Sequence, residues 1–128
     1  MARVLIVEPH PDVRDALAAV CETWHHDVAT AADGPEALAI VAVFNPEAVV
    51  LDLGLRGGLD NVEVAARIRD IDGEQVFIVA LTGWTPVGDR AKALETAADT
   101  VLAKPPDLDE LQKAIAEAGD DLRRRSRS

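Results

Sequence analysis

The sequence of 128 residues has a single cysteine, Cys21, and no hydrophobic run long enough to cross a membrane. One cysteine cannot form a disulfide framework, so we expect a reducing compartment. The apolar runs are much shorter than the ~18 residues of a membrane span. The first of them soon meets Glu8, unlike the apolar core of a signal peptide. We therefore predict a soluble, cytoplasmic protein with no membrane segment.

Basic residues are scarce outside the last six positions. The chain has 13 basic and 23 acidic residues, for a formal net charge of −10. Four arginines lie at positions 123, 124, 125 and 127, which leaves 9 bases against 23 acids in residues 1–122, a net charge of −14. Such a surface repels phosphate backbones, so we expect no nucleic-acid binding by this domain. We assign residues 1–122 to one domain and 123–128 to an arginine-rich tail, which we expect to be disordered.

Short apolar runs alternate with amphipathic segments along the whole chain. Strands are predicted at 3–7, 27–30, 48–53, 76–81 and 100–103. Helices are predicted from Pro11 to about Trp24, from Gly34 to Phe44, from about Asn61 to Ile71, from about Val87 to Ala98, and from Leu108 to Leu122. This alternation with short connections predicts an α/β fold, a doubly wound five-stranded parallel sheet of (βα)5 type with helices on both faces.

The helical periodicity also predicts which side chains face the sheet. In the first helix these are Val13, Leu17, Val20, Cys21 and Trp24; in the third, Val62, Ala65, Ala66 and Ile68; in the last, Leu108, Leu111, Ile115 and Leu122. Arg67, Arg69 and Asp70 of the third helix are predicted to face outward.

Polar residues lie at the carboxyl ends of the first, third, fourth and fifth predicted strands, and they are Glu8, Asp52, Thr82 and Lys104. Because the carboxyl ends of parallel strands meet at one edge of the sheet, these side chains can share a pocket. Each alone is more often a helix cap, a turn residue or a solvated charge. Together they suit phosphoryl transfer to a carboxylate, with one acid as nucleophile and a second helping to hold a divalent cation such as Mg²⁺. A hydroxyl and an ammonium complete the binding of the phosphoryl oxygens.

The sequence resembles the receiver domain of response regulators in two-component signalling, over residues 3 to about 120. The resemblance rests on five motifs: Val4-Leu5-Ile6-Val7-Glu8, Val50-Leu51-Asp52-Leu53, Asp60-Asn61-Val62-Glu63, Ala80-Leu81-Thr82-Gly83 and Ala97-Ala98-Asp99-Thr100-Val101-Leu102-Ala103-Lys104-Pro105. It implies the flavodoxin-like fold, in which the strands, numbered along the chain, lie in the order 2-1-3-4-5, as they do in chemotaxis receivers.

The resemblance also implies roles for the residues at the sheet edge. Asp52 would be the phosphoacceptor, Thr82 would bind a phosphoryl oxygen, and Lys104 would pair with the acid or its phosphate. The Lys104-Pro105 peptide bond, which follows the strand at 100–103, would be cis. Glu8, Asp52 and the carbonyl of Gly54 would be the candidate Mg²⁺ ligands. A sensor histidine kinase or phosphotransfer protein would supply the phosphoryl group. A downstream protein would bind the face formed by the predicted helix at 87–98, the strand at 100–103 and the last helix.

The chain departs from the family pattern at several places. Pro9 replaces a second acid, so we expect Mg²⁺ binding to be weaker. The segment from Gly54 to Asp60 is one residue longer than usual, and Val101 stands where a switching aromatic residue is common. His10 is expected to be a loop or cap residue, and Trp84 either gates the pocket or packs over the following helix.

Two alternatives to a phosphoacceptor follow from these departures. A pseudo-receiver would act as an interaction module without phosphorylation, and Pro9 with the altered loop favours this reading. A phosphatase with an aspartyl-phosphate intermediate would need a second acid two residues after Asp52, where the chain has Gly54. We therefore expect that the protein is not an enzyme, and we keep the pseudo-receiver as the alternative.

Overall fold

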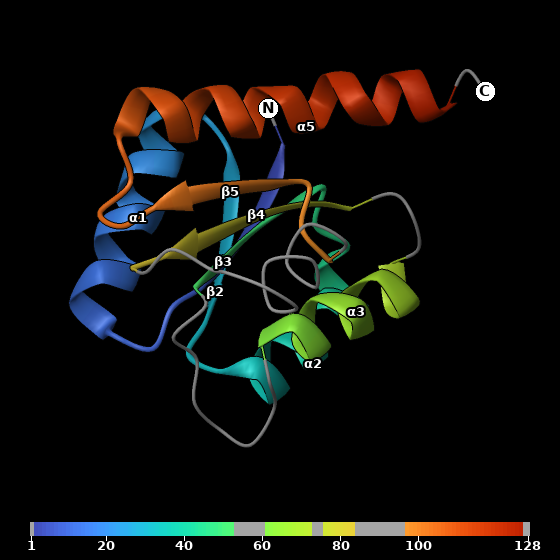
Figure 1. Ribbon diagram of the computed structural model, residues 1–128, viewed down its shortest axis with the longest axis horizontal. Helices are drawn as coiled ribbons and strands as arrows, with labels where there is room; N and C mark the ends of the chain where they lie inside the picture. Colours follow the sequence, from blue (N-terminus) through green and yellow to red (C-terminus); the bar gives the residue numbers. More distant parts are fainter. Residues whose placement is uncertain (1, 53–60, 73–75, 84–96, 127–128) are drawn as a thin grey trace.

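The computed structural model of the chain describes residues 2–52, 61–72, 76–83 and 97–126 (Figure 1). Its strands are β1 (Arg3–Val7), β2 (Asp27–Ala31), β3 (Ala48–Asp52), β4 (Phe77–Thr82) and β5 (Thr100–Ala103). They form one parallel sheet in the order β2-β1-β3-β4-β5. The predicted fold class and strand order are confirmed.

The three central strands lie where the apolar runs are continuous. Every residue of β3 and β4 is buried, and β1 is buried from Val4 onward. The edge strands β2 and β5 are only partly buried, as the weaker apolar content of their sequences predicts. The register pairs Val7 with Leu51 and Asp52 with Leu81, so β1, β3 and β4 end at the same edge of the sheet.

The described helices cover both faces of this sheet. They are α1 (Pro11–Thr23), α2 (Gly34–Phe44), α3 (Asn61–Asp72) and α5 (Leu108–Ser126). Leu17 and Cys21 of α1 and Leu111 and Ile115 of α5 pack on one face, and α2 and α3 cover the other (Figure 1). The helix predicted at about 87–98 lies almost entirely outside the described residues. Within the part of the chain that the structure describes, no helix combines the length and the apolar character needed to cross a membrane.

Local signals in the sequence set the ends of α2. The side chain of Asp33 accepts a hydrogen bond of 2.9 Å from the Glu36 N–H, which is the arrangement of an N-cap. Pro35 lies in the first turn, where its missing N–H costs nothing. The helix ends at Asn45, whose φ of 51° is the left-handed conformation that asparagine tolerates. The predicted bounds of this helix are therefore confirmed.

Two large apolar residues predicted to face the sheet are exposed instead. Val13 is 41% exposed and Leu108 is 50% exposed. Each lies in the first turn of its helix, at the end that meets the carboxyl edge of the sheet. There the helix begins beyond the last residues of the strands, so its first apolar residue has no sheet beneath it.

Two further predictions on the helices are wrong or differ from the structure. In α3 it is Val64 that is buried, whereas Ala66 is exposed. The two are separated by about 200° around the helix axis, so they cannot share a face. The helix α5 continues to Ser126, so the backbone is helical through four residues of the tail for which we expected disorder. Arginine favours helix, and after Gly119 no further glycine or proline interrupts the segment.

Arg69, predicted to face outward, instead bonds to the residues that directly precede β4 and β5. It donates hydrogen bonds to the carbonyls of Val76 (3.2 Å) and Ala97 (3.0 Å). It also forms an ion pair of 2.8 Å with Asp99, whose Oδ2 accepts the N–H of Ile78 at 2.8 Å. The spacing of apolar residues in α3 could not predict these contacts, because Arg69 lies beside the buried face formed by Val64, Ala65 and Ile68 rather than opposite to it.

Replacing Arg69 with alanine is expected to lower the free energy of unfolding by about 2 kcal/mol, because charged hydrogen bonds are lost and buried carbonyls lose their donor. The matched control is Arg67→Ala on the same helix. The contact of Arg67 with the described residues is an exposed pair with Glu63, four residues away, and pairs of this kind contribute about 0.3–0.5 kcal/mol. Urea unfolding followed by circular dichroism measures both. Equal losses in the two variants would contradict the structural role of Arg69.

Candidate functional site

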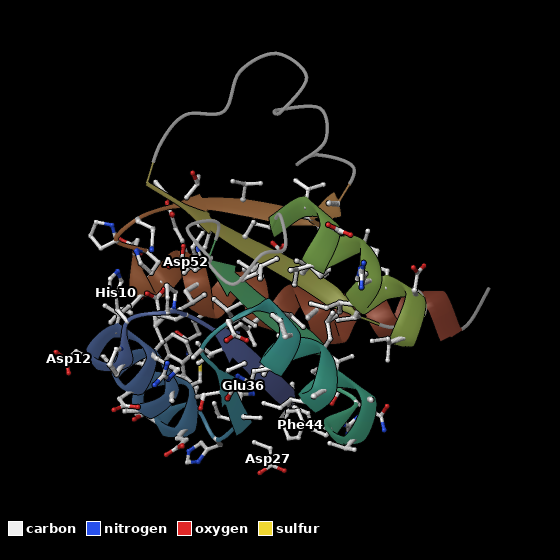
Figure 2. The ribbon with its side chains drawn as sticks, turned by 90° about the horizontal axis from the view of Figure 1, so that it is seen from below. His10, Asp12, Asp27, Glu36, Phe44 and Asp52 are labelled. Carbon is white, nitrogen blue, oxygen red and sulfur yellow. The ribbon has the colours of Figure 1, made fainter. Side chains whose placement is uncertain are left out.

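Two acids and one lysine come together at the carboxyl edge of the sheet. Glu8 directly follows β1, Asp52 is the last residue of β3, and Lys104 directly follows β5. The Lys104 ammonium forms an ion pair with Asp52 Oδ2 and lies 3.7 Å from Glu8 Oε2. Figure 2 shows Asp52 on the same side of the molecule as His10 and away from Phe44. The sequence therefore identified these three residues as neighbours correctly.

The burial of the three residues is unequal. Glu8 is 1% exposed and Asp52 is 2% exposed, whereas the Lys104 side chain is 28% exposed. Both acids end central strands that have a neighbour on each side, while Lys104 follows an edge strand. The two carboxyl groups thus lie at the ends of central strands, and the Lys104 ammonium approaches them from an edge strand.

Thr82 and Lys104 are linked through their main chains. The Lys104 N–H donates a hydrogen bond of 2.8 Å to the Thr82 carbonyl, which extends the pairing of β4 with β5 by one step. The Lys104-Pro105 peptide bond is cis, as the resemblance implied. Thr82 is buried at the end of β4, on the same edge as Asp52.

Glu8 is held by several hydrogen bonds. Its N–H donates to the Ala31 carbonyl (3.0 Å), its own carbonyl accepts from Arg14 Nη1 (3.1 Å), and its Oε1 accepts from the His10 N–H (3.3 Å). Its other oxygen, Oε2, is buried and has no hydrogen-bond partner among the described residues. This oxygen therefore lies near the Lys104 ammonium, at 3.7 Å, without a hydrogen bond to it.

Burial, together with the neighbouring Asp52 carboxyl, raises the pKa of Glu8 from 4.5 to about 7. The His10 N–H and the Lys104 charge act on this pKa in the opposite direction. A second negative charge beside a buried carboxylate is unfavourable, so Glu8 tends to hold a proton unless a cation joins the pocket.

The donor set of the pocket suits a hard divalent cation. Asp52 and Glu8 supply carboxylate oxygens, and Glu8 Oε2, which has no hydrogen-bond partner among the described residues, is the kind of buried atom that a cation would satisfy. In the described part of the chain no three His, Cys, Asp or Glu side chains form a metal-binding group. Among the described residues, Glu8 and Asp52 are therefore the two carboxylates placed to bind such an ion. Pro9, which stands where the family usually has a second acid, adds no ligand. The third predicted ligand, the carbonyl of Gly54, lies outside the described residues.

His10 occupies the position expected of it. It is the N-cap residue of α1, is exposed, and makes no capping hydrogen bond with its side chain. Its contribution to the site is its backbone N–H. Trp84 and the lengthened segment from Gly54 to Asp60 lie outside the described residues. Val101, in the place of the usual aromatic residue, is 39% exposed on β5.

The sequence did not identify Arg14 as part of this site. The signal was present in the prolines: in the segment from Glu8 to Pro11, neither Pro9 nor Pro11 has an N–H. A corner with so few donors needs a side chain to satisfy its carbonyls. An arginine in the first helical turn can supply that donor, and Arg14 does.

A parallel sheet in the order 2-1-3-4-5 with acids and a lysine at its carboxyl edge defines an α/β protein of the flavodoxin-like type. The family model described as the response regulator receiver domain matches residues 4–116. The chain therefore belongs to the family of response regulator receiver domains, the signalling module of two-component systems.

Known proteins agree with this assignment. The chain is 40% identical over 111 residues to the transcriptional regulatory protein TcrA of Mycobacterium tuberculosis, covering 85% of this chain and 42% of that protein. It is 38% identical over 123 residues to the transcriptional regulatory protein PrrA of Mycobacterium bovis, covering 96% of this chain and 51% of that protein. The chain thus spans about half the length of the curated relatives it matches.

The solved structure of a receiver domain of the sensor histidine kinase PA1611 of Pseudomonas aeruginosa is also similar, with a TM-score of 0.80 and 29% identity over 92% of this chain and 98% of that one. That structure holds a magnesium ion coordinated in its active-site cleft.

Proposed function

We propose that this receiver domain is a phosphoacceptor, phosphorylated on Asp52 by a sensor histidine kinase or a phosphotransfer protein. The observation that carries the proposal is the buried Asp52 carboxylate paired with the Lys104 ammonium at the carboxyl edge of the sheet. In this reading the domain spans residues 1–122, acts in the cytoplasm and signals through protein contacts rather than by turning over a substrate.

Each residue of the site has a distinct role in the proposed transfer. An oxygen of the Asp52 carboxylate attacks the phosphorus atom, and the bond from phosphorus to the histidine nitrogen of the donor breaks as a new P–O bond forms. Lys104 neutralises the negative charge on Asp52 and then on the phosphoryl oxygens. Thr82, at the end of β4, donates its hydroxyl to one of those oxygens.

Glu8 and Asp52, with the carbonyl of Gly54, would hold a magnesium ion. When bound, this ion would neutralise charge on the transferring phosphoryl group. The chain's own contribution is the pair of buried carboxylates, in which Glu8 Oε2 has no hydrogen-bond partner among the described residues. We propose that affinity is modest, because Pro9 supplies no ligand.

The proposed signalling surface comprises β5, α5 and the chain between β4 and β5. Val101 of β5 and Leu108 of α5 are the large exposed apolar side chains of its described part, at 39% and 50% exposure. Both lie close in sequence to Lys104, so a protein bound there would be in position to respond to the site. No nucleic acid or membrane is part of this proposal.

The pseudo-receiver remains the second candidate, because Pro9 leaves the pocket with two carboxylates in place of three. Such a domain would use the same surface without phosphorylation. It would have no need of the buried Asp52–Lys104 ion pair, and for this reason we place it second.

The test is to incubate the protein with Mg²⁺ and acetyl phosphate and to follow its intact mass. We expect a gain of one phosphoryl group, which is removed by hydroxylamine as an acyl phosphate is, and which peptide mapping places on Asp52. Omission of Mg²⁺ is expected to reduce the gain strongly. No gain at saturating donor and metal would favour the pseudo-receiver, and sustained release of phosphate would favour a hydrolase.

A further inference from the structure

The contact between Arg14 and Glu8 has no part in the chemistry proposed above. Arg14 is half-buried in the first turn of α1, and its Nη1 donates to the main-chain carbonyl of Glu8 at 3.1 Å. The pKa of Glu8 is altered chiefly by burial, and then by Asp52, His10 and Lys104. The contact that the structure gives Arg14 is thus to the backbone of Glu8 rather than to its carboxylate.

The backbone at this corner has few other donors. Pro9 and Pro11 have no N–H, the Glu8 N–H bonds to Ala31, and the His10 N–H bonds to Glu8 Oε1. The guanidinium of Arg14 is therefore the group that satisfies the Glu8 carbonyl, through a charge-assisted hydrogen bond. Glu8 is thus bonded through its N–H, its carbonyl and its Oε1, and its Oε2 lies 3.7 Å from the Lys104 ammonium.

We propose that Arg14 is a positioning residue for the divalent cation: by holding the Glu8 carbonyl, it fixes the Glu8 carboxylate so that Oε2 is presented to the ion. The proposal rests on the proposed function, in which Glu8 is a metal ligand. The position of Glu8 matters more in this chain because the next residue is Pro9, so no adjacent acid could bind the ion if Glu8 were displaced. Residues that orient a ligand from behind commonly change metal affinity by about 10–100-fold when they are replaced.

The sign of the effect separates positioning from electrostatics. A positive charge near a cation site opposes cation binding, so removing that charge alone would strengthen Mg²⁺ binding. Loss of positioning weakens it. Arg14→Gln removes the charge and the guanidinium together, so the direction of the change shows which role dominates. Arg14→Lys keeps the charge and a donor, and its affinity is expected to lie between those of the wild type and Arg14→Gln.

The experiment measures Mg²⁺ affinity by titration calorimetry and by the shift of the thermal unfolding midpoint with Mg²⁺ concentration. We expect Arg14→Gln to weaken binding about tenfold, while the phosphorylation rate at saturating Mg²⁺ stays within about threefold of the wild type. Arg67→Gln, the same change at an exposed position of α3, is expected to bind Mg²⁺ like the wild type.

A double-mutant cycle tests the route through Glu8. In the Glu8→Gln background, Arg14→Gln is expected to weaken Mg²⁺ binding no further. A merely structural role would lower the unfolding free energy and leave the Mg²⁺ affinity unchanged, and that result would overturn the proposal. Unchanged or tighter binding in Arg14→Gln would do so as well. A wild-type protein that binds Mg²⁺ but gains no phosphate would instead overturn the proposed function.

Discussion

Replacement of Asp52 by asparagine is expected to abolish the phosphoryl gain from acetyl phosphate completely while leaving the fold intact. The amide has no anionic oxygen to attack phosphorus, so no acyl phosphate can form. Asparagine is close to aspartate in size, so the 2% exposed position stays filled. Intact mass after incubation with the donor and Mg²⁺ measures the first expectation, and circular dichroism measures the second.

The matched control for this change is Asp12→Asn. Asp12 is an exposed acid in the first turn of α1, on the same side of the molecule as Asp52 (Figure 2). We expect this variant to gain phosphate to the wild-type extent, because its side chain has no part in the pocket. If Asp52→Asn gained phosphate like the wild type, the acceptor would be another residue and the proposed function would fail in its central point.

The contribution of Glu8 to the free energy of unfolding in metal-free buffer is expected to fall as the pH rises from about 4.5 to about 7. Burial, and then the Asp52 carboxyl, raise the pKa of Glu8 from 4.5 to about 7 in the folded protein. Between these values the folded state holds a proton that the unfolded state has lost, so stability decreases with rising pH. The contribution of protonated Glu8 is fully present below pH 4.5 and is lost as the pH passes through about 7. Its size is about 3 kcal/mol.

Glu8→Gln isolates this contribution because the amide does not titrate. We expect the stability of Glu8→Gln relative to the wild type to increase steadily from about pH 5 to about pH 8. The control is Glu117→Gln, at an exposed position on α5, which is expected to follow the wild-type profile. Urea unfolding at several pH values in the presence of a chelator measures all three proteins. Parallel profiles for the wild type and Glu8→Gln would show that Glu8 does not hold the proton.

The sheet could be predicted from sequence because its signals are local and strong. The runs before Glu8 and Asp52 are continuously apolar, so their burial on both faces follows from composition alone. The ends of α2 follow from Asp33, Pro35 and Asn45, each with its own chemical reason. These signals do not depend on residues far away in the chain.

The residues whose predicted burial or exposure was wrong show that a periodic pattern contains no information on tertiary contacts. The pattern assigns a face to Val13 and Leu108, but whether sheet lies beneath that face depends on where the strands end in space. The contacts of Arg69 with Ala97 and Asp99 span about thirty positions of sequence, and no period relates residues so far apart. Tertiary geometry, rather than local preference, decides both.

The sequence predicted the charged residues of the candidate site but not Arg14, which bonds to the backbone of one of them. Glu8, Asp52 and Lys104 could be selected because they follow or end strands and because their chemistry fits one reaction. Arg14 reaches the same corner from a helix, through a contact to a main-chain oxygen. A backbone contact leaves no complementary residue in the sequence, so only the absence of N–H groups at Pro9 and Pro11 pointed to it.

The division of charge between inner and outer strands has a mechanical consequence. Glu8 and Asp52 follow or end strands that are hydrogen-bonded on both sides, while Lys104 follows a strand bonded on one side only. Moving an acid would strain two ladders, whereas moving the lysine strains one. The two carboxyl groups are therefore held more rigidly than the Lys104 ammonium. A movement within the site is expected to displace Lys104 and β5 more than the central strands β1 and β3.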